Sequence, residues 1–374
     1  MDTTRDIDIN LDDDFFNTQL ITYIGNKRRL LGFLNSGIDF VKSRLNKDKI
    51  TAMDGFAGSG VVSRLLKFHC SELWTNDLER YSYLVNKCYL CNPGDIDTKH
   101  IKSVIEKINS IPNDEFVPGF ITENYAPNDD NNIKPNERVF YTRRNAMFLD
   151  TAKHYIYNNV APDIQPFVLA PLIVGASIHT NTSGVFKGFH KKDGVGHFGG
   201  AGENALSRIM ADIKLDMPIL RDAPCDVHVL QSDINELVCG DKCFDLVYYD
   251  PPYNQHPYGS NYFMLNILAN ESDDIEIQDG VSGIAKNWNR SAYNKRVQAI
   301  EAMDNLVKNT KAKYLLISYN NEGIIPFDEF ENTLKKYGRV QLFEQEYNTY
   351  RGSRNLNSRN IRVKELLWVL ETKN

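Results

Sequence analysis

The sequence predicts an α/β fold built on a mixed, mostly parallel sheet, and three observations support this class. Strand-like and helix-like segments alternate over residues 50–92, as they do when right-handed crossovers connect parallel strands. The alternation stops at residue 93 and resumes at residue 226, which indicates an inserted region. Two strand-like segments then end the sequence on either side of a polar loop, which indicates an antiparallel hairpin joined to the parallel strands.

Periodicity places the individual elements outside the insertion. Valine and leucine recur at helical spacing in the helices, whereas the strands are short apolar runs. We expect helices at about 31–43, 61–69, 80–90 and 297–307, and strands at 50–53, 72–75, 226–230, 244–249, 313–319, 340–346 and 363–371. Residues 1–20 are polar, and residues 1–14 carry six acids and one base. We therefore expect 1–20 to be a flexible acidic segment.

The inserted region, residues 93–225, has no repeated β–α unit and is rich in asparagine, proline and glycine. We expect it to fold as a separate, mostly irregular or helical region. Pro127–Asn132 reads as an exposed loop. Phe167–Ile178 is the longest apolar run, but it is too short to span a bilayer, so we expect a buried core helix and no membrane partner.

Composition and charge limit the compartment and the partners. The formal charge is −6, of which residues 1–14 account for −5. The rest of the chain is therefore nearly neutral, so a local basic groove can bind a polyanion. The amino-terminal segment lacks the apolar stretch of a secretory signal, which favours the cytoplasm. Of the six cysteines, Cys88 and Cys91 could bind zinc with Cys239 and Cys243, but the second pair is spaced loosely. Buried free thiols and no metal are the preferred interpretation.

Asp250-Pro251-Pro252-Tyr253 follows the apolar strand at 244–249 and suits recognition of a planar ring that carries an amino group. The Asp250 carboxylate and the Pro251 carbonyl can accept hydrogen bonds from that amino group, while Tyr253 offers a face for stacking. The prolines stiffen the turn. A plain Pro-Pro turn with a helix-capping aspartate is the alternative interpretation of these four residues.

A glycine-rich loop, Asp54–Gly60, joins the first strand to the next helix. Its glycines allow a ligand to approach the backbone closely, and the following helix offers free N–H groups. The loop is neither a dinucleotide fingerprint nor a phosphate loop. Asp77 ends the second strand, where an acid can bind ribose hydroxyls. Together these residues predict a pocket for a nucleoside that carries an amino acid.

With these motifs the sequence resembles the S-adenosylmethionine-dependent DNA adenine-N6 methyltransferases of the Dam-like, or D12, class. The resemblance implies a Rossmann-like sheet, with a catalytic domain formed by 21–92 and 226–374 and target recognition by 93–225. It implies S-adenosylmethionine as cofactor, double-stranded DNA as partner, and a role beside a restriction endonuclease or alone. We expect a monomer or a weak dimer.

The resemblance also assigns roles to individual residues. The implied catalytic residues are Asp250, Pro251, Pro252 and Tyr253, and the implied target-base pocket is Tyr253, Ser318 and Asn320. The implied cofactor-binding residues are Tyr23, Gly25, Lys27, Asp54, Phe56, Gly58, Ser59, Gly60, Asp77, Asp233 and Asp250. The flipped-out adenine would present its amino group to Asp250 and Pro251 and stack on Tyr253.

Three basic stretches are candidates for contacts with DNA. The residues are Arg143, Arg144, Lys187, Lys191, Lys192, Arg351, Arg354 and Arg359. Each stretch can equally be a solvated surface. Two alternatives to the adenine reaction stay open at this point. One is a cytosine-N4 or RNA adenine methyltransferase, and the other is a catalytically silent DNA-binding module.

Overall fold

The computed structural model describes residues 9–348 and 362–373. Its main sheet has seven strands in the order β5-β2-β1-β6-β7-β9-β8. The strands are β1 (Ile50–Asp54), β2 (Cys70–Asp77), β5 (Asp226–Gln231), β6 (Phe244–Tyr249), β7 (Ala312–Asn320), β8 (Gly338–Asn348) and β9 (Arg362–Thr372). Only β9 runs antiparallel to its neighbours, β7 and β8. The predicted mixed α/β sheet with a carboxyl-terminal antiparallel hairpin is confirmed.

The order in which the chain adds strands reverses beside β1, and this reversal creates a crevice at the edge of the sheet. β1 pairs in parallel with β2 on one side and with β6 on the other. The chain runs from β1 to β2 and β5 on one side and then crosses back to β6 and β7 on the other. Ligands of such sheets bind at the carboxyl ends of the strands beside this point of reversal. The loops that follow β1 and β6 are the glycine-rich loop and the Asp250–Tyr253 motif.

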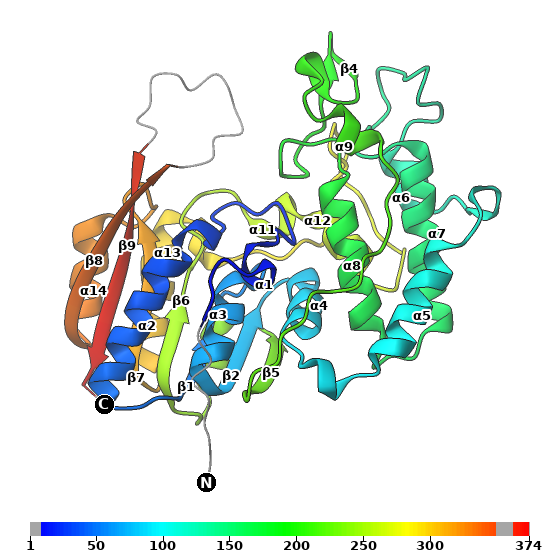
Figure 1. Ribbon diagram of the computed structural model, residues 1–374. Coiled ribbons are helices and arrows are strands. Elements are labelled where there is room, and N and C mark those ends of the chain that lie inside the picture. The colour runs from blue at the N-terminus through cyan, green and yellow to red at the C-terminus, as the bar shows by residue number, and fades with distance from the viewer. Residues whose placement is uncertain (1–8, 349–361, 374) are drawn as a thin grey trace.

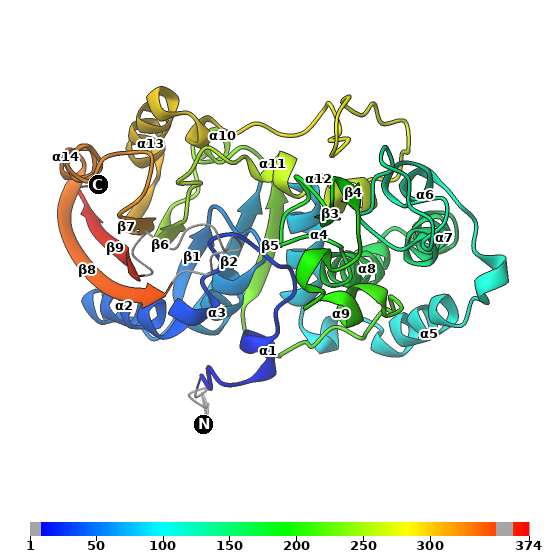
Figure 2. The ribbon, with the colours of Figure 1, turned by 90° about the horizontal axis from the view of Figure 1, so that it is seen from above.

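Helices cover both faces of the sheet (Figure 2). α2 (Leu31–Leu45) and α3 (Val61–His69) lie on one face, and α10 (Ile234–Leu237), α13 (Arg296–Asn309) and α14 (Phe327–Lys335) lie on the other. Strand β6 is buried on both sides and shows the alternation that results. Leu246 and Tyr248 pack towards α2 and α3, whereas Val247 and Tyr249 pack towards α13.

A helical lobe stands beside the sheet (Figure 1). It contains α5 (Thr98–Asn109), α6 (Phe120–Tyr125), α7 (Arg143–Asn159), α8 (Gln165–Ile178), α9 (Leu206–Met210) and the short hairpin of β3 (Lys191–Lys192) and β4 (Val195–Gly196). α8 is apolar around its whole circumference and almost entirely buried, which confirms the predicted core helix.

The core of this lobe extends beyond residues 93–225. It includes α4 (Arg80–Tyr89), which follows β2, and α12 (Phe263–Ala269), which comes after the Asp250–Tyr253 motif. α11 (Tyr258–Asn261) precedes α12. α8 packs against both α4 and α12. The lobe and the sheet are therefore joined by shared apolar packing as well as by chain connections.

The expectation of a flexible amino-terminal segment is wrong for its last residues. α1 (Asp14–Asn17) carries Phe15 and Phe16, which are buried and contact the ring of Phe68 on α3. The backbone carbonyl of Phe15 accepts a hydrogen bond from the buried Arg64 guanidinium. Phe15 and Phe16 thus anchor a segment that we expected to be flexible because of its acidic composition. Residues 1–8 lie outside the described part of the chain.

The cysteines only partly follow the expectation of buried thiols. Cys70, Cys88 and Cys225 are buried and Cys91 is half-buried, but Cys239 and Cys243 are exposed. The interpretation was therefore wrong for Cys239 and Cys243, because both precede the point at which β6 enters the core. Among residues 9–348 and 362–373, no group of three histidine, cysteine or acidic side chains gathers as a metal site would require. No helix in these ranges is long and apolar enough to cross a membrane.

Candidate active site

A cavity of about 470 Å³ opens at the carboxyl ends of β1, β2 and β6, and its volume lies in the range of small-molecule sites. Every predicted cofactor residue except Gly60 lines it. These are Tyr23, Gly25, Lys27, Asp54, Phe56, Gly58, Ser59, Asp77, Asp233 and Asp250. The strand order thus brings together residues that lie more than two hundred positions apart in the sequence.

The glycine-rich loop is held in a conformation that needs glycine. Gly58 and Gly60 have φ angles of 52° and 75°, in the left-handed region that other residues avoid. A Cβ atom on Gly58 would lie 2.8 Å from Cε1 of Tyr23, and one on Gly60 would lie 2.4 Å from Oδ1 of Asn86. The loop can therefore pass this close to Tyr23 and Asn86 only because Gly58 and Gly60 have no Cβ atom.

Asp77 fastens this loop to the end of β2. Its Oδ2 accepts a hydrogen bond of 2.7 Å from the Gly58 N–H, and its Oδ1 accepts one of 2.8 Å from the Glu79 N–H. Asp77 also lines the cavity, and a carboxylate oxygen can accept more than one hydrogen bond. Asp77 therefore positions the loop and remains available to hydroxyl donors.

Asp54 is the buried acid at the start of the loop, with a relative exposure of 1%. Its Oδ2 accepts a 2.6 Å hydrogen bond from the Ser63 hydroxyl, and its Oδ1 accepts one of 3.3 Å from the Phe56 N–H. Burial raises the pKa of Asp54 to about 7, although the Ser63 hydrogen bond opposes this shift. A cationic ligand in the cavity would stabilise the ionised form.

Asp250 belongs to a buried cluster of charged side chains. The Lys27 ammonium lies 3.0 Å from Asp250 Oδ1 and 2.9 Å from Oε1 of Glu365, a residue of β9. It also lies 5.7 Å from the centre of the Tyr253 ring. Burial would lower the pKa of Lys27, but the charges of Asp250 and Glu365 raise it well above its usual value. Lys27 therefore stays protonated.

The same cluster shifts the pKa of Asp250. Burial raises the pKa of Asp250 to about 6, the Lys27 ammonium lowers it, and the Glu365 carboxylate raises it. Sequence reasoning missed Glu365. The only available signal was an acid next to the apolar run Leu366–Leu370 of β9.

An aromatic stack forms another wall of the site. The Tyr23 ring stacks on Tyr258 and Tyr262, with centroid distances of 4.9 and 4.8 Å. The Tyr258 hydroxyl donates to the Ile24 carbonyl, and the Ile24 N–H donates to the Tyr262 hydroxyl. The segment before α2 is thereby fixed to α11 and α12, which follow the Asp250–Tyr253 motif.

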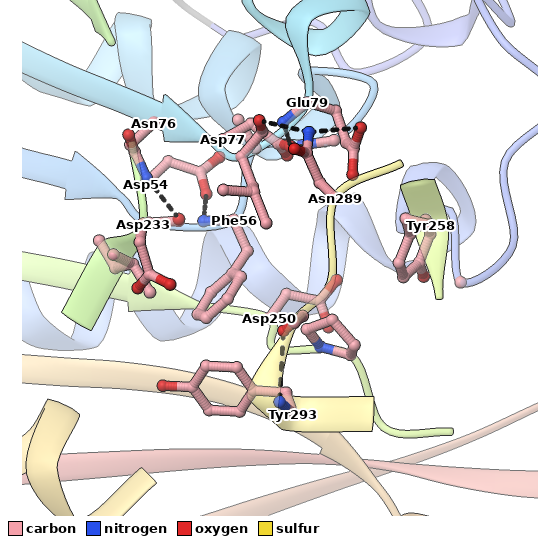
Figure 3. A pocket seen from close by; sticks show the side chains of 18 of the residues that line it. Asp54, Phe56, Asn76, Asp77, Glu79, Asp233, Asp250, Tyr258, Asn289 and Tyr293 are labelled. Atoms are coloured by element: carbon pink, nitrogen blue, oxygen red, sulfur yellow. Dashed lines mark hydrogen bonds between the residues drawn. The ribbon is translucent and has the colours of Figure 1, made fainter. Parts of the chain in front are cut away.

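The segment 289–294 crosses the cavity and was not predicted (Figure 3). The Asn289 side-chain amide donates to the Leu78 carbonyl at 3.2 Å and to Glu79 Oε2 at 3.1 Å. The Tyr293 hydroxyl donates to Asn235 Oδ1 at 2.7 Å, and the Tyr293 ring meets Phe56 edge to face. The segment lacks any helical or strand period, so the sequence carried no signal for its position.

Replacing Asn289 with alanine is expected to weaken ligand binding in this cavity. The change removes both hydrogen bonds that tie the segment to the end of β2, each of which is worth about 1 kcal/mol. Calorimetric titration with S-adenosylmethionine, the cofactor that the sequence predicts, should show a dissociation constant raised by about tenfold. Asn270→Ala is the matched control, since that exposed side chain bonds only within its own turn. Equal affinity in the two variants would contradict the expectation.

Some predicted residues lie away from the cavity surface. Gly60, Pro251 and Tyr253 adjoin lining residues in the sequence but do not themselves line the cavity. Ser318 is buried in β7, and its hydroxyl faces Tyr248. The Asn320 side chain accepts a hydrogen bond from the Glu322 N–H at 3.0 Å. Neither Ser318 nor Asn320 lines the cavity.

The basic residues fall into separate places. Arg144 pairs with Asp212, and the Arg143 guanidinium donates to the Pro127 carbonyl at 3.4 Å, so both side chains have partners near α7. Lys191 and Lys192 are exposed on the β3–β4 hairpin at the top of the helical lobe, and Lys187 precedes them (Figure 1). Arg351, Arg354 and Arg359 lie outside the described residues.

The chain was compared with known proteins. The model of a family described as "D12 class N6 adenine-specific DNA methyltransferase" matches residues 23–333. The type II methyltransferase M.NlaIII of Neisseria lactamica is 28% identical over 359 residues, which cover 94% of this chain and 99% of that protein. M.CviAII of Paramecium bursaria Chlorella virus 1 is 27% identical over 88% of this chain and 93% of its own length. Modification methylase StsI of Streptococcus sanguinis is 28% identical over 94% of this chain, but over only 52% of its own length.

Proposed function

Since the chain belongs to the D12 class N6 adenine-specific DNA methyltransferase family, we propose that the cavity binds S-adenosylmethionine and that Asp250–Tyr253 hold the target adenine. Membership makes the protein a sequence-specific DNA methyltransferase. The assignment of the site rests on the position of Asp250, which lines the same cavity as the glycine-rich loop.

The residues around the cavity fit S-adenosylmethionine. This cofactor supplies a methyl group on a positively charged sulfur, and it also carries an ammonium group. Carboxylates surround the cavity on several sides, namely Asp54, Asp77, Glu79, Asp233 and Asp250, which suits a ligand with positive centres. Asp54 would hold the ammonium group, Asp77 the ribose hydroxyls, and Asp233 the amino group of the cofactor's adenine. Gly58 would keep the loop close to the Tyr23 ring, so that both can line the cofactor.

Asp250 would act on the target base as a hydrogen-bond acceptor. Its side chain retains 18% exposure, and its Oδ1 is engaged by Lys27. The Oδ2 atom is therefore the oxygen available to the adenine amino group, and the Pro251 carbonyl is a second acceptor beside it. Two such hydrogen bonds would shift the nitrogen towards a tetrahedral geometry and make its lone pair nucleophilic. Tyr253 would stack on the base and offset part of the cost of extrusion.

The helical lobe is proposed to read the DNA sequence. The exposed lysines of its hairpin, Lys191 and Lys192, support contact with phosphates. We also propose that the protein acts on double-stranded DNA in the cytosol and works beside a restriction endonuclease. The relatives named as type II and modification methylases support this role.

The test is incubation of the protein with mixed-sequence DNA and methyl-labelled S-adenosylmethionine, followed by modified-base sequencing. The expected product is N6-methyladenine at one short sequence. Label on cytosine would refute the assignment of the base, and an absence of label would favour a silent DNA-binding module.

Activity is expected to fall as the pH decreases through about 7 and then about 6. The pKa of Asp54 is raised to about 7 and that of Asp250 to about 6, in both cases first by burial. Because both carboxyls are needed in the ionised form, protonation removes an acceptor for the ligand and then one for the base. The pH profile of kcat/KM reports groups of the free enzyme, so it should show this acidic limb. A flat profile across that range would contradict the proposed roles.

A further inference from the structure

Glu365 is a buried carboxylate for which the proposed mechanism has no direct use. Its relative exposure is 0%, and it does not line the cavity. It begins the apolar part of β9, where it lies opposite Asn320 of β7 and Gln345 of β8. Because β9 is antiparallel to β7, the start of β9 lies at the carboxyl ends of β6 and β7. Glu365 is therefore brought to the active-site edge by the last strand of the sheet.

Lys27 is the connection between Glu365 and the active site. Its ammonium lies 2.9 Å from Glu365 Oε1 and 3.0 Å from Asp250 Oδ1. The Lys27 side chain has 5% exposure, so these two carboxylates supply its charge partners in a nearly dry site. One ammonium is thus shared between a carboxylate that faces the cavity and one that is sealed inside the protein.

Stability does not explain a glutamate at this position. Taking a carboxylate out of water costs several kcal/mol, and replacing a buried ion cluster with apolar residues is often neutral or stabilising. Glu365 instead fixes the position of the Lys27 ammonium. The Lys27 ammonium lies 3.0 Å from Oδ1 of Asp250, and Glu365 holds it there by a second ion pair of 2.9 Å.

We propose that Glu365 is a positioning residue for methyl transfer, which acts through Lys27 to keep Asp250 Oδ2 free for the target amino group. The inference rests on the proposed role of Asp250. Without Glu365, the ammonium would be free to move onto both oxygens of Asp250 and compete with the base. Charge supports the same conclusion. The positive charge of Lys27 is shared between two carboxylates, which leaves Asp250 a stronger hydrogen-bond acceptor.

The groups that face Asp250 come from several elements. They are Lys27 before α2, Asp54 at the end of β1, Tyr248 on β6, Tyr253 and Tyr258 after β6, and Glu365 on β9. Among the causes that shift the pKa of Asp250, Lys27 lowers it and Glu365 raises it. Removing the charge of Glu365 should therefore lower the pKa of Asp250.

The first experiment uses Glu365→Gln, which has nearly the same shape without the charge. The kcat for DNA methylation should fall by about tenfold or more, since small misplacements of a catalytic group can cost about a hundredfold. The acidic limb of the kcat profile should move to lower pH by about one unit. The affinity for S-adenosylmethionine, measured by calorimetry, should stay unchanged. A carbon-13 NMR titration of the Asp250 carboxyl should show the same downward shift without any turnover.

The matched control is Glu371→Gln, the same change on the same strand, where the side chain pairs with Arg339 far from the site. It should leave kcat and its pH profile unchanged. Glu365→Leu serves as a second variant if Glu365→Gln folds poorly, because an apolar residue suits this buried position. It should also lose kcat while binding the cofactor normally.

A double-mutant cycle with Lys27→Met tests the route of the effect. If Glu365 acts through Lys27, Glu365→Gln should change kcat little in the Lys27→Met background above the acidic limb. An equal loss in both backgrounds would overturn the proposal, as would a Glu365→Gln protein with the kcat and pH profile of the native chain. An active Asp250→Ala protein would overturn both this inference and the proposed catalytic site. An inactive Asp250→Ala protein with normal Glu365→Gln kinetics would overturn the inference alone.

Discussion

Asp250→Ala is expected to abolish methylation while leaving the binding of S-adenosylmethionine largely intact. The change removes the acceptor that prepares the adenine nitrogen, and Lys27 keeps Glu365 as a partner in the core. Removing one preorganised polar contact of this kind costs about 100-fold to 1,000-fold. Because Asp250 also orients Lys27, we expect the loss to reach at least the upper end of that range. Transfer of a labelled methyl group to DNA measures the loss, and calorimetry measures cofactor affinity.

The control for this variant is Asp241→Ala. Asp241 is fully exposed and pairs with Lys311 at the other end of β6, so its loss should leave both measurements unchanged. Asp250→Asn adds a finer comparison, because it keeps one oxygen acceptor but no charge for Lys27. We expect it to be more active than Asp250→Ala and less active than the native protein. An Asp250→Ala protein with native activity would contradict the assignment of the catalytic motif.

Gly58→Ala is expected to weaken cofactor binding by at least about tenfold. A left-handed conformation costs a residue with a Cβ atom about 1–2 kcal/mol. The new Cβ atom would also lie 2.8 Å from the Tyr23 ring, which is itself held in a stack with Tyr258 and Tyr262. Relief of this contact must move either the loop or the stack, and both line the cavity. The dissociation constant for S-adenosylmethionine, from calorimetric titration, measures the effect.

Gly94→Ala is the matched control. A Cβ atom on Gly94 meets nothing within 4 Å, and its φ angle lies outside the left-handed range. This variant should bind the cofactor as the native protein does. If Gly58→Ala also kept native affinity, the glycine-rich loop would not be the cofactor cradle that its geometry suggests.

The parts of the fold that were predictable are those with a strict period or a distinctive loop. Val61–His69 and Phe244–Tyr249 match the observed α3 and β6, because their apolar residues follow one spacing from end to end. The glycine-rich loop and the Asp250–Tyr253 motif were found for a different reason. Their residue types are unusual at the ends of strands.

The parts that were missed depend on contacts between distant segments. Glu365 has only a weak local signal, since an acid near the start of a strand is usually exposed, and it is the pairing of β9 with β7 and β8 that brings Glu365 into the core. Asn289 and Tyr293 belong to a polar segment whose place over the cavity is set by hydrogen bonds to Leu78, Glu79 and Asn235. Phe15 and Phe16 were hidden by the acids around them. In each case the tertiary partner decides the position.

The shared core of the helical lobe limits how this enzyme can be re-engineered. Residues 93–225 are contiguous in the sequence and supply most of the helical lobe that is proposed to read the DNA, so they invite exchange with a relative as a cassette that changes the recognised site. However, α8 packs on α4 and α12, which both lie outside that range. A foreign cassette would have to match two surfaces that it does not carry. Successful chimeras are therefore expected to transplant α4 and α12 together with the insertion.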